Sequence, residues 1–233
     1  MKILGLDTAT ESCSAALLVD GRIVSREQEF ERGHAEHILL MVDQVLAEAS
    51  VRLSDLDAIA FGRGPGAFTG VRLAASVAQG LAFASGVPVV PVSDLAAVAQ
   101  RALGLAFRPD RVLVCSDARM QEVYWACFAL DPNGFAMIVG SEHVSHPDKV
   151  ELPAAWQDGT SMPVGVGRGF RAYPSLGVRL QTQVRVARDD LLPRAIEVAQ
   201  LAAVDAMAGR LLTPEEAIPV YLRDDVARPQ SRN

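Results

Sequence analysis

The chain is poor in cysteine and in aromatic residues, and it has no excess of positive charge. It contains three cysteines among 233 residues, an odd number, which favours free thiols in a reducing compartment over a disulfide framework. Only 6% of residues are aromatic, so aliphatic and alanine side chains must build the core. The net charge of −6 disfavours a free-standing polyanion binder, and the 50% hydrophobic content excludes a disordered chain. These features predict a cytoplasmic globular protein of one large or two small domains.

Charge is missing altogether from residues 73–93, a run about long enough to span a bilayer. Gly86, Pro88 and Pro91 interrupt it, so the pattern predicts a buried helix, a turn and a buried strand. The first residues, MKILGLD, are too short and too soon acidic for a signal peptide. We therefore expect a soluble protein without membrane contact.

Several catalytic motifs are also missing. There is no GxSxG nucleophile motif, and the glycine-rich segment at residues 62–70 lacks the GK[ST] ending of a P-loop. Two HxxH pairs, His34 with His37 and His143 with His146, have no third ligand nearby, so solvated or capping histidines are expected rather than zinc ligands. Nucleophilic and zinc chemistry have no support in the sequence.

What the chain does have is a pattern of strands that occurs twice. Apolar residues 3–6 end at Asp7, and two further strands follow at residues 14–19 and 22–30 around an Asp-Gly turn. About 110 residues later, an apolar run ends at Asp117 and two more strands follow around a second Asp/Gly turn. The pattern predicts an internal duplication, with one domain at residues 1–105 and a second at residues 106–233.

Two predicted helices of the first domain are apolar on both sides. The helix at about residues 34–49 has a partly apolar second face, and so does the helix at about residues 71–85. These second faces consist of His37, Leu40, Met41 and Gln44 on the first helix, and Leu73, Val77, Gly80 and Ala84 on the second. Either the core is thick, or these faces meet another protein, with Gly80 and Ala84 permitting close approach.

The two strand ends and the glycine-rich turn are candidates for ligand binding. Asp7 and Asp117 each end a buried strand, where paired carboxylates can flank a metal-bound phosphate. No glycine follows Asp117 to let a phosphate approach, although Arg119 can attract one, so a phosphotransfer site is not expected. The turn at residues 62–72 is either an anion site at a helix N-terminus or a tight turn with close backbone approach.

Positive charge is concentrated in residues 159–188, which carry five arginines and no acidic residue. Arginine suits bidentate contact with phosphate, and Arg168 and Arg171 are therefore candidate RNA contacts. The alternative is a solvated loop surface.

Together these segments resemble the TsaB family, also called YeaZ. The matching segments are LDTATE at residues 6–11, HAE at 34–36, the turn at 62–72, DARMQEVY at 117–124 and PVYLR at 219–223. The most specific positions are Gly64, Pro65, Gly66, Thr69, Gly70 and Arg72 in the turn, with Asp7, Asp117 and Arg119 at the strand ends. The resemblance covers the whole chain and is strongest before about residue 125.

The resemblance implies an α/β fold of two ribonuclease-H-like lobes, as in the actin, heat-shock chaperone and sugar-kinase superfamily, with the second lobe reduced. It also implies a non-catalytic scaffold in making threonylcarbamoyladenosine on tRNA. The expected partners are a TsaD-like transferase, a TsaE-like ATPase and, in isolation, a second copy of the chain, with tRNA reached indirectly through the complex. The TsaD-like metal-binding HxxxH corresponds to residues 94–98, which contain no histidine, so no cofactor is expected. The alternative is an ATP-dependent or metal-dependent enzyme acting alone.

Overall fold

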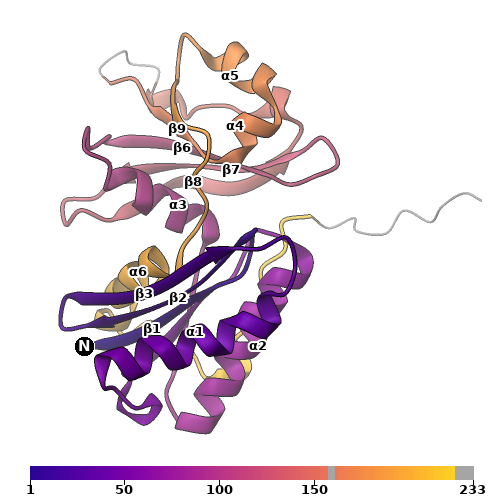
Figure 1. Cartoon of the computed structure of the whole chain (residues 1–233). Helices are drawn as coiled ribbons and strands as arrows, with labels where there is room; N and C mark the ends of the chain where they lie inside the picture. The colour runs from indigo at the N-terminus through magenta and orange to yellow at the C-terminus, as the bar shows by residue number, and fades with distance from the viewer. Residues whose placement is uncertain (157–160, 224–233) are drawn as a thin grey trace, which may run out of the picture.

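A computed structural model describes residues 1–156 and 161–223, which form two lobes stacked one above the other (Figure 1). Each lobe is built on a five-stranded mixed sheet, with strand order β3-β2-β1-β4-β5 in the first and β8-β7-β6-β9-β10 in the second. In both sheets the first three strands are antiparallel, and the remaining two add in parallel. The repeated order confirms the predicted α/β fold of two ribonuclease-H-like lobes.

The strands of the first sheet are β1 (Lys2–Asp7), β2 (Ser12–Val19), β3 (Arg22–Glu29), β4 (Ala58–Gly62) and β5 (Val89–Val92). Those of the second are β6 (Arg111–Asp117), β7 (Val123–Leu130), β8 (Ala136–Ser145), β9 (Val164–Val166) and β10 (Arg185–Arg188). The α-helices are α1 (His34–Ala49), α2 (Phe68–Ser85), α3 (Asp94–Leu103), α4 (Arg168–Ala172), α5 (Pro174–Leu180) and α6 (Ala195–Met207). Short 3-10 turns are η1 (Leu53–Asp55), η2 (Pro147–Lys149), η3 (Ala154–Trp156) and η4 (Pro214–Glu216).

Helices and sheets alternate in five layers. Helices α1 and α2 cover one face of the first sheet, and α6 covers the other. Helix α3 lies between the two sheets and contributes Ala97 to the core under α6 and Val98 to the core of the second lobe. Helices α4 and α5 cover the outer face of the second sheet. Because α3 belongs to both cores, the relative position of the lobes is fixed by packing.

The end of the chain returns to the first lobe. Helix α6 approaches β1 so closely that a Cβ on Gly5 would come within 2.5 Å of the carbonyl oxygen of Ala195. Leu212 then pairs with Val89 at the edge of the sheet, and η4 packs against α2. The C-terminal strap, which we define as residues 217–223, runs along the glycine-rich turn and is held there by a 2.7 Å hydrogen bond from Val220 N to Arg63 O.

Three expectations from the sequence need correction. Helix α2 begins at Phe68 rather than near residue 71, because its N-cap, Ala67, has no capping side chain to mark the start. Helices α4 and α5 were not expected, since both are short and each contains a glycine. Met41 does not lie on the outer face of α1: it is only 8% exposed and packs in the core of the first lobe, because α1 is buried over a wide arc.

Among the described residues, no helix has the length and apolar character needed to cross a membrane.

Candidate functional site

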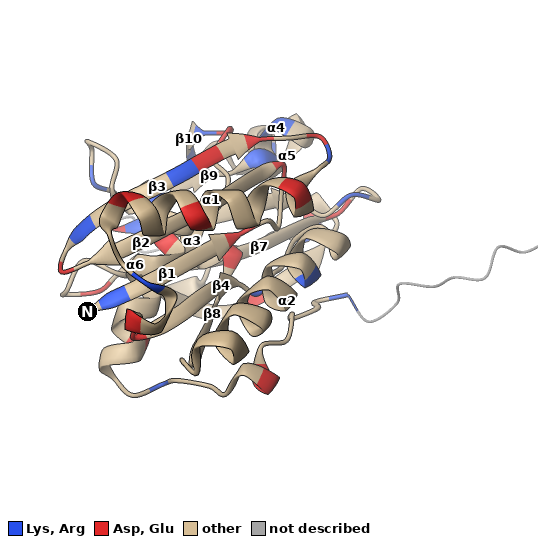
Figure 2. Ribbon diagram, turned by 60° about the horizontal axis from the view of Figure 1, so that its bottom comes forward, with Lys and Arg blue, Asp and Glu red and all other residues tan. Residues whose placement is uncertain are grey.

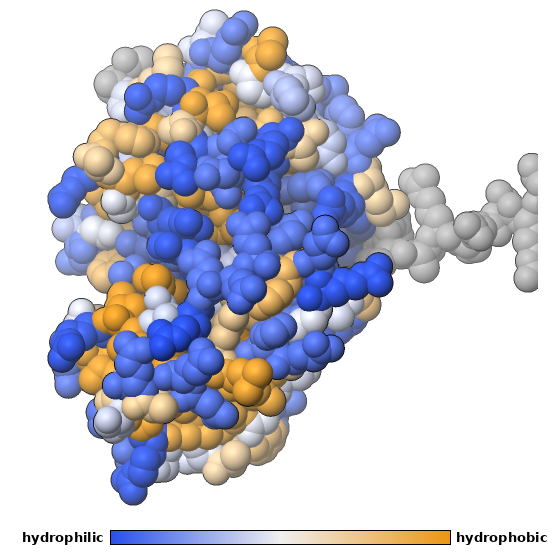
Figure 3. All heavy atoms as spheres, viewed as in Figure 1, coloured by the Kyte–Doolittle hydropathy of each residue, from blue (hydrophilic) through white to orange (hydrophobic). Residues whose placement is uncertain are grey.

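A cavity of about 430 Å³ lies between the lobes, large enough for a small ligand. The turns after β1 and β6, the glycine-rich turn, α4 and the strap all contribute to it, through residues that include Thr10, Pro65, Asp117, Arg119, Arg168 and Tyr221. In the space-filling view, hydrophilic side chains dominate the region between the lobes (Figure 3). The glycine-rich turn and the turns that follow the two predicted strand ends therefore meet at one cleft, and Asp117 lines it.

Asp7 is not exposed in this cleft. It is fully buried at the end of β1 and faces Asp94, which is 2% exposed at the start of α3. One oxygen of Asp7 accepts a 3.1 Å hydrogen bond from Ala9 N, and one oxygen of Asp94 accepts from Gly64 N. The two remaining oxygens, which have no other partner, both lie 2.5 Å from the position that a Cβ on Gly62 would take.

Two buried carboxyl groups this close do not both ionise, so a proton shared between them supplies the missing partner of each. Burial and the neighbouring Asp7 raise the pKa of Asp94 well above its usual value. Burial also raises the pKa of Asp7, against the opposing effect of its hydrogen bonds. Asp7 is thus committed to joining β1, the glycine-rich turn and α3, and is not free to bind a ligand in the cleft.

Asp117, at the end of β6, already has a cation beside it. Arg119 contacts Asp117 at 3.0 Å and Glu11 at 3.3 Å, and so joins a carboxylate of each lobe. Tyr173 donates a further 3.1 Å hydrogen bond to Asp117, and burial together with the proximity of Asp117 raises the pKa of Tyr173. Asp117 is therefore already paired with a cation, the guanidinium group of Arg119, which also reaches Glu11 of the first lobe.

The turn after β6 has an unusual backbone. Arg119, Met120 and Gln121 all have φ between 52° and 61°, three consecutive left-handed residues without a glycine. Such a conformation costs roughly 1–2 kcal/mol per residue and persists only when neighbours hold it. Arg223 of the strap does so, by donating to Ala118 O at 3.2 Å and to Glu122.

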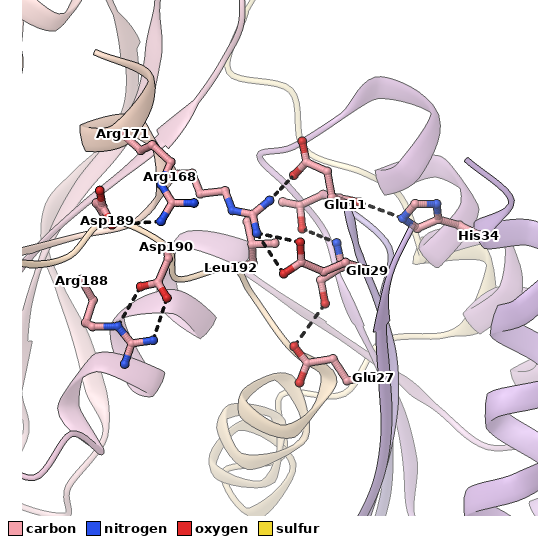
Figure 4. Close-up of polar contacts among 12 residues, drawn as sticks. Glu11, Glu27, Glu29, His34, Arg168, Arg171, Arg188, Asp189, Asp190 and Leu192 are labelled. Carbon is pink, nitrogen blue, oxygen red and sulfur yellow. Dashed lines mark hydrogen bonds and ion pairs between the residues drawn. The ribbon is translucent and has the colours of Figure 1, made fainter. Parts of the chain in front are cut away.

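Arg168 joins the two lobes through the same carboxylate, Glu11, and through Glu29. From α4 it donates to both carboxylate oxygens of Glu29, at 2.7 and 2.9 Å, and to Glu11 at 3.4 Å (Figure 4). A second contact between the lobes joins Arg63 to Glu142 at 3.0 Å. The cleft is bordered by ion pairs that connect the first lobe with the second.

We expect Arg168→Ala to lower the free energy of unfolding by about 1 kcal/mol, because the pair with Glu29 is only partly shielded from water. The loss should shrink in high salt. The matched control is Arg171→Ala, which removes a 56% exposed side chain with one 3.2 Å contact to Asp189 and should change stability little. Urea unfolding at two salt concentrations measures both variants, and equal losses would contradict the role given to Arg168.

The five arginines of the basic segment all have partners within the chain. Asp189 and Asp190 lie directly after that segment and pair with Arg171 and Arg188, as Figure 4 shows. The other three arginines are also engaged: Arg168 with Glu11 and Glu29, Arg179 with the carbonyl oxygens of Pro147 and Val150, and Arg185 over the ring of Phe107. Gly159 and Thr160 lie outside the described residues. Of the two candidate RNA contacts, Arg168 pairs with Glu11 and Glu29 of the first lobe, and Arg171 pairs with Asp189.

The cysteines are buried and free. Burial raises the pKa of Cys13 to about 12, that of Cys127 to about 12, and that of Cys115 well above its usual value. These thiols are unsuited to nucleophilic chemistry. In residues 1–156 and 161–223, no three His, Cys, Asp or Glu side chains come together to hold a metal ion.

The outer face of the first lobe carries exposed apolar residues, visible over the lower lobe in Figure 3. Leu40 is 58% exposed and Gln44 is exposed on α1, while His37 is half-buried and stacks on Phe30. On α2, an exposed row runs along the helix at helical spacing, flanked by half-buried Leu73 and Val77. We call this row the α2 stripe; it consists of Arg72, Ser76, Gly80, Phe83 and Ala84.

Comparison with known proteins identifies the family. The chain is 40% identical to an Escherichia coli protein named "tRNA threonylcarbamoyladenosine biosynthesis protein TsaB", over 97% of this chain and 96% of that protein. The chain belongs to the TsaB family. A Haemophilus influenzae protein of the same name is 37% identical over 97% of this chain and 95% of its own length. The family model described as "TsaD: tRNA N6-adenosine threonylcarbamoyltransferase" matches residues 26–161.

A solved structure supports the same assignment. A Pseudomonas aeruginosa protein described as uncharacterized with similarity to peptidase YeaZ shares 47% identity and superposes with a TM-score of 0.87, covering 95% of this chain and 99% of that one. The family resemblance and the fold predicted from the sequence are both confirmed.

In this TsaB-family chain, residues of the sequence motifs contact the backbone of neighbouring segments and so hold the fold together. A Cβ on Gly66 would come within 2.6 Å of Ala9 O, so the turn needs glycine to pack on the β1–β2 connection. Thr8 donates a 2.7 Å hydrogen bond to Gly70 O at the same contact. Asp94 was missed, because an acidic residue in the first turn of a helix is common and gave no sign of a partner. Phe83 was also missed, although it lies three residues after Gly80 on the predicted face.

Proposed function

We propose that the chain is a non-catalytic subunit required for threonylcarbamoyl modification of the tRNA adenosine next to the anticodon. In this role it binds a TsaD-like transferase, and a TsaE-like ATPase docks on the pair. The names of the relatives support the pathway, and the match to the TsaD family model supports pairing between related folds. The proposal places the protein in the cytoplasm, where its three free thiols would stay reduced.

The observation that carries the binding role is the α2 stripe. Helix α2 contains no acidic residue and a single charged one, Arg72, and it is almost entirely uncoloured in the charge view of Figure 2. Gly80 has open space where a Cβ would be, so another helix can approach its backbone closely. Phe83, 56% exposed, supplies apolar area three residues further along α2, and Leu40 is an exposed apolar residue on α1. An uncharged exposed helix of this kind is typical of a protein–protein interface.

The absence of catalysis is supported by the cleft. Asp7 is buried against Asp94, and Arg119 lies between Asp117 and Glu11, so neither acid is free for a metal-bound phosphate. We therefore expect the isolated chain to give no binding heat with ATP and Mg²⁺ in calorimetry. Tight nucleotide binding or ATP hydrolysis by the lone chain would contradict this part of the proposal and favour an enzyme.

The binding role is tested by Gly80→Arg and Ala84→Arg. Both positions are exposed, so the folded chain accommodates the longer side chains, but a partner helix cannot approach over them. We expect at least a tenfold loss of affinity for the TsaD-like transferase, about 1.4 kcal/mol or more, and loss of co-purification. The same helices can pair with a second copy, so the isolated wild-type chain should be a dimer and the variants monomers.

Gly80→Ala is the control, since it adds one methyl group in open space. Its affinity should stay close to that of the wild type. Circular dichroism and urea unfolding should show that all three variants are folded. Unchanged affinity of a folded Gly80→Arg variant in a titration would rule out the α2 stripe as the interface.

A further inference from the structure

Arg72, at the N-terminal end of the α2 stripe, is held by aromatic rings. Its guanidinium carbon lies 3.3 Å from the ring centroid of Phe68 and 5.1 Å from that of Tyr221. Phe68 belongs to the first turn of α2, whereas Tyr221 comes from the strap, and the two ring centroids are 6.0 Å apart. Segments from opposite ends of the chain thus combine to hold one cation.

In the part of the chain that the structure describes, the charge of Arg72 is not paired with an acidic side chain. Its side chain is exposed, and among the described parts of the chain no carboxylate forms an ion pair with it. This contrasts with the arginines around the cleft, Arg119, Arg168 and Arg223, each of which contacts at least one carboxylate. The acidic side chains around the cleft pair with those arginines, and the guanidinium group of Arg72 faces solvent.

Contact with the rings also reduces the conformational entropy that Arg72 would lose when a partner binds to it. A free arginine loses rotamer freedom on binding, but here contact with Phe68 already restricts the side chain. Stacking uses a face of the guanidinium plane and leaves its N–H edges available for a planar, bidentate acceptor such as a carboxylate. Phe68 and Tyr221 remain 54% and 44% exposed, and aromatic residues with arginine are the residue types enriched at energetic centres of interfaces.

The position of Arg72 connects it to the proposed interface. Arg72, Ser76, Gly80 and Ala84 are spaced four residues apart, so they lie in one row of about 18 Å on the exposed side of α2. A helix that packs over Gly80 and Ala84 therefore extends toward Arg72. Since nothing else on α2 is charged, this end of the row is the place where charge complementarity can fix the direction and register of the partner.

We infer that Arg72, with Phe68 and Tyr221, forms an anchor for a carboxylate of the partner protein that docks on the α2 stripe. This inference rests on the proposed function and adds the chemistry that the partner must present: an aspartate or glutamate at the end of its apolar docking surface. The strap has a part in the anchor, because it supplies one of the two rings.

The test measures heterodimer affinity for Arg72→Ala, Arg72→Lys and Arg72→Glu, at low and high salt. We expect Arg72→Ala to weaken binding at least tenfold and to reduce its salt dependence. Arg72→Lys should recover only part of the loss, because an ammonium group lacks the planar fork, and Arg72→Glu should bind more weakly than Arg72→Ala. The control is Arg22→Ala, an exposed arginine on β3 at the far edge of the sheet, which should leave affinity unchanged.

A charge swap identifies the carboxylate. Acidic residues on the transferase surface are changed singly to lysine, and one of them should restore the binding of the Arg72→Glu variant. Affinity of Arg72→Ala within twofold of the wild type would overturn the inference, and so would failure of every swap. If Gly80→Arg abolishes binding while the Arg72 variants do not, the docking surface stands and only the anchor is lost. A wild-type chain that does not bind the transferase would overturn both.

Discussion

Replacing Gly70 with alanine is expected to lower the free energy of unfolding by about 3 kcal/mol, since the added methyl group meets backbone rather than a movable side chain. A Cβ at this position would lie much closer than 3.0 Å to the carbonyl oxygen of Thr8, and real Cβ atoms essentially never come that close to another heavy atom. Thr8 also donates its hydroxyl hydrogen to Gly70 O at 2.7 Å, so the clash breaks a hydrogen bond that joins α2 to the β1–β2 connection.

Gly80→Ala provides a matched control on the same helix. Gly80 lies in α2 with no atom within 4 Å of its Cβ position, so alanine should stabilise the helix by about 0.5–1 kcal/mol. Urea unfolding followed by circular dichroism compares the two variants directly. Similar stability changes in both would show that Gly70 is not required for close approach of the backbone.

Asp94→Ala is expected to cost about 3 kcal/mol, because it leaves Asp7 buried without its partner and Gly64 N without its acceptor. Asp94→Asn should be much milder. Its amide oxygen can still accept from Gly64 N, and its NH₂ group can donate to Asp7 in place of the shared proton. A loss for Asp94→Asn as large as that for Asp94→Ala would show that the two carboxyl groups do not share a proton.

The same pair predicts how stability depends on pH. The pKa of Asp94 is raised in the folded chain, so the folded state keeps a proton that the unfolded chain releases above its ordinary value of 3.8. The contribution of the pair is therefore complete below about pH 4 and is lost as pH rises toward the raised pKa, by up to about 1.4 kcal/mol per pH unit. His34, Arg63 and Glu197 also affect the pKa values of the pair, but all three are present in the wild-type chain and in the Asp94→Asn variant.

Asp94→Asn has no such proton to lose, so the wild type should lose stability relative to this variant over the pH range above the ordinary value of 3.8. Unfolding free energies measured across that range give the difference directly. Parallel pH profiles for the two proteins would contradict the assignment of a raised pKa.

The sequence predicted those parts of the fold that depend on local pattern. The Asp20-Gly21 turn was predicted from residue type, and both residues have the positive φ that such a turn requires. The outer faces of α1 and α2 were predicted from helical spacing, but Met41 was misplaced because periodicity alone does not show how wide the buried arc is.

The parts that could not be predicted depend on contacts between distant segments. Arg168 meets Glu29, 139 residues away, and nothing in either local sequence marks the other. The segment at residues 159–188 looked basic because it stops directly before Asp189 and Asp190. Only the three-dimensional structure shows that these two acids pair with Arg171 and Arg188. The shared proton of Asp7 and Asp94 likewise depends on β1 and α3 meeting across Gly62.

The return of α6 to the first sheet has a consequence for synthesis on the ribosome. The sheet face that includes Ile3, Ala60 and Val90 is covered by α6, so it stays open after β5 has been made, until residues 93–207 have also been added. At typical rates of translation this takes on the order of 10 s. The second lobe, complete once β10 has emerged, can fold while the first still waits for its last helix. During this interval the nascent first lobe exposes an apolar sheet face and is therefore prone to aggregation.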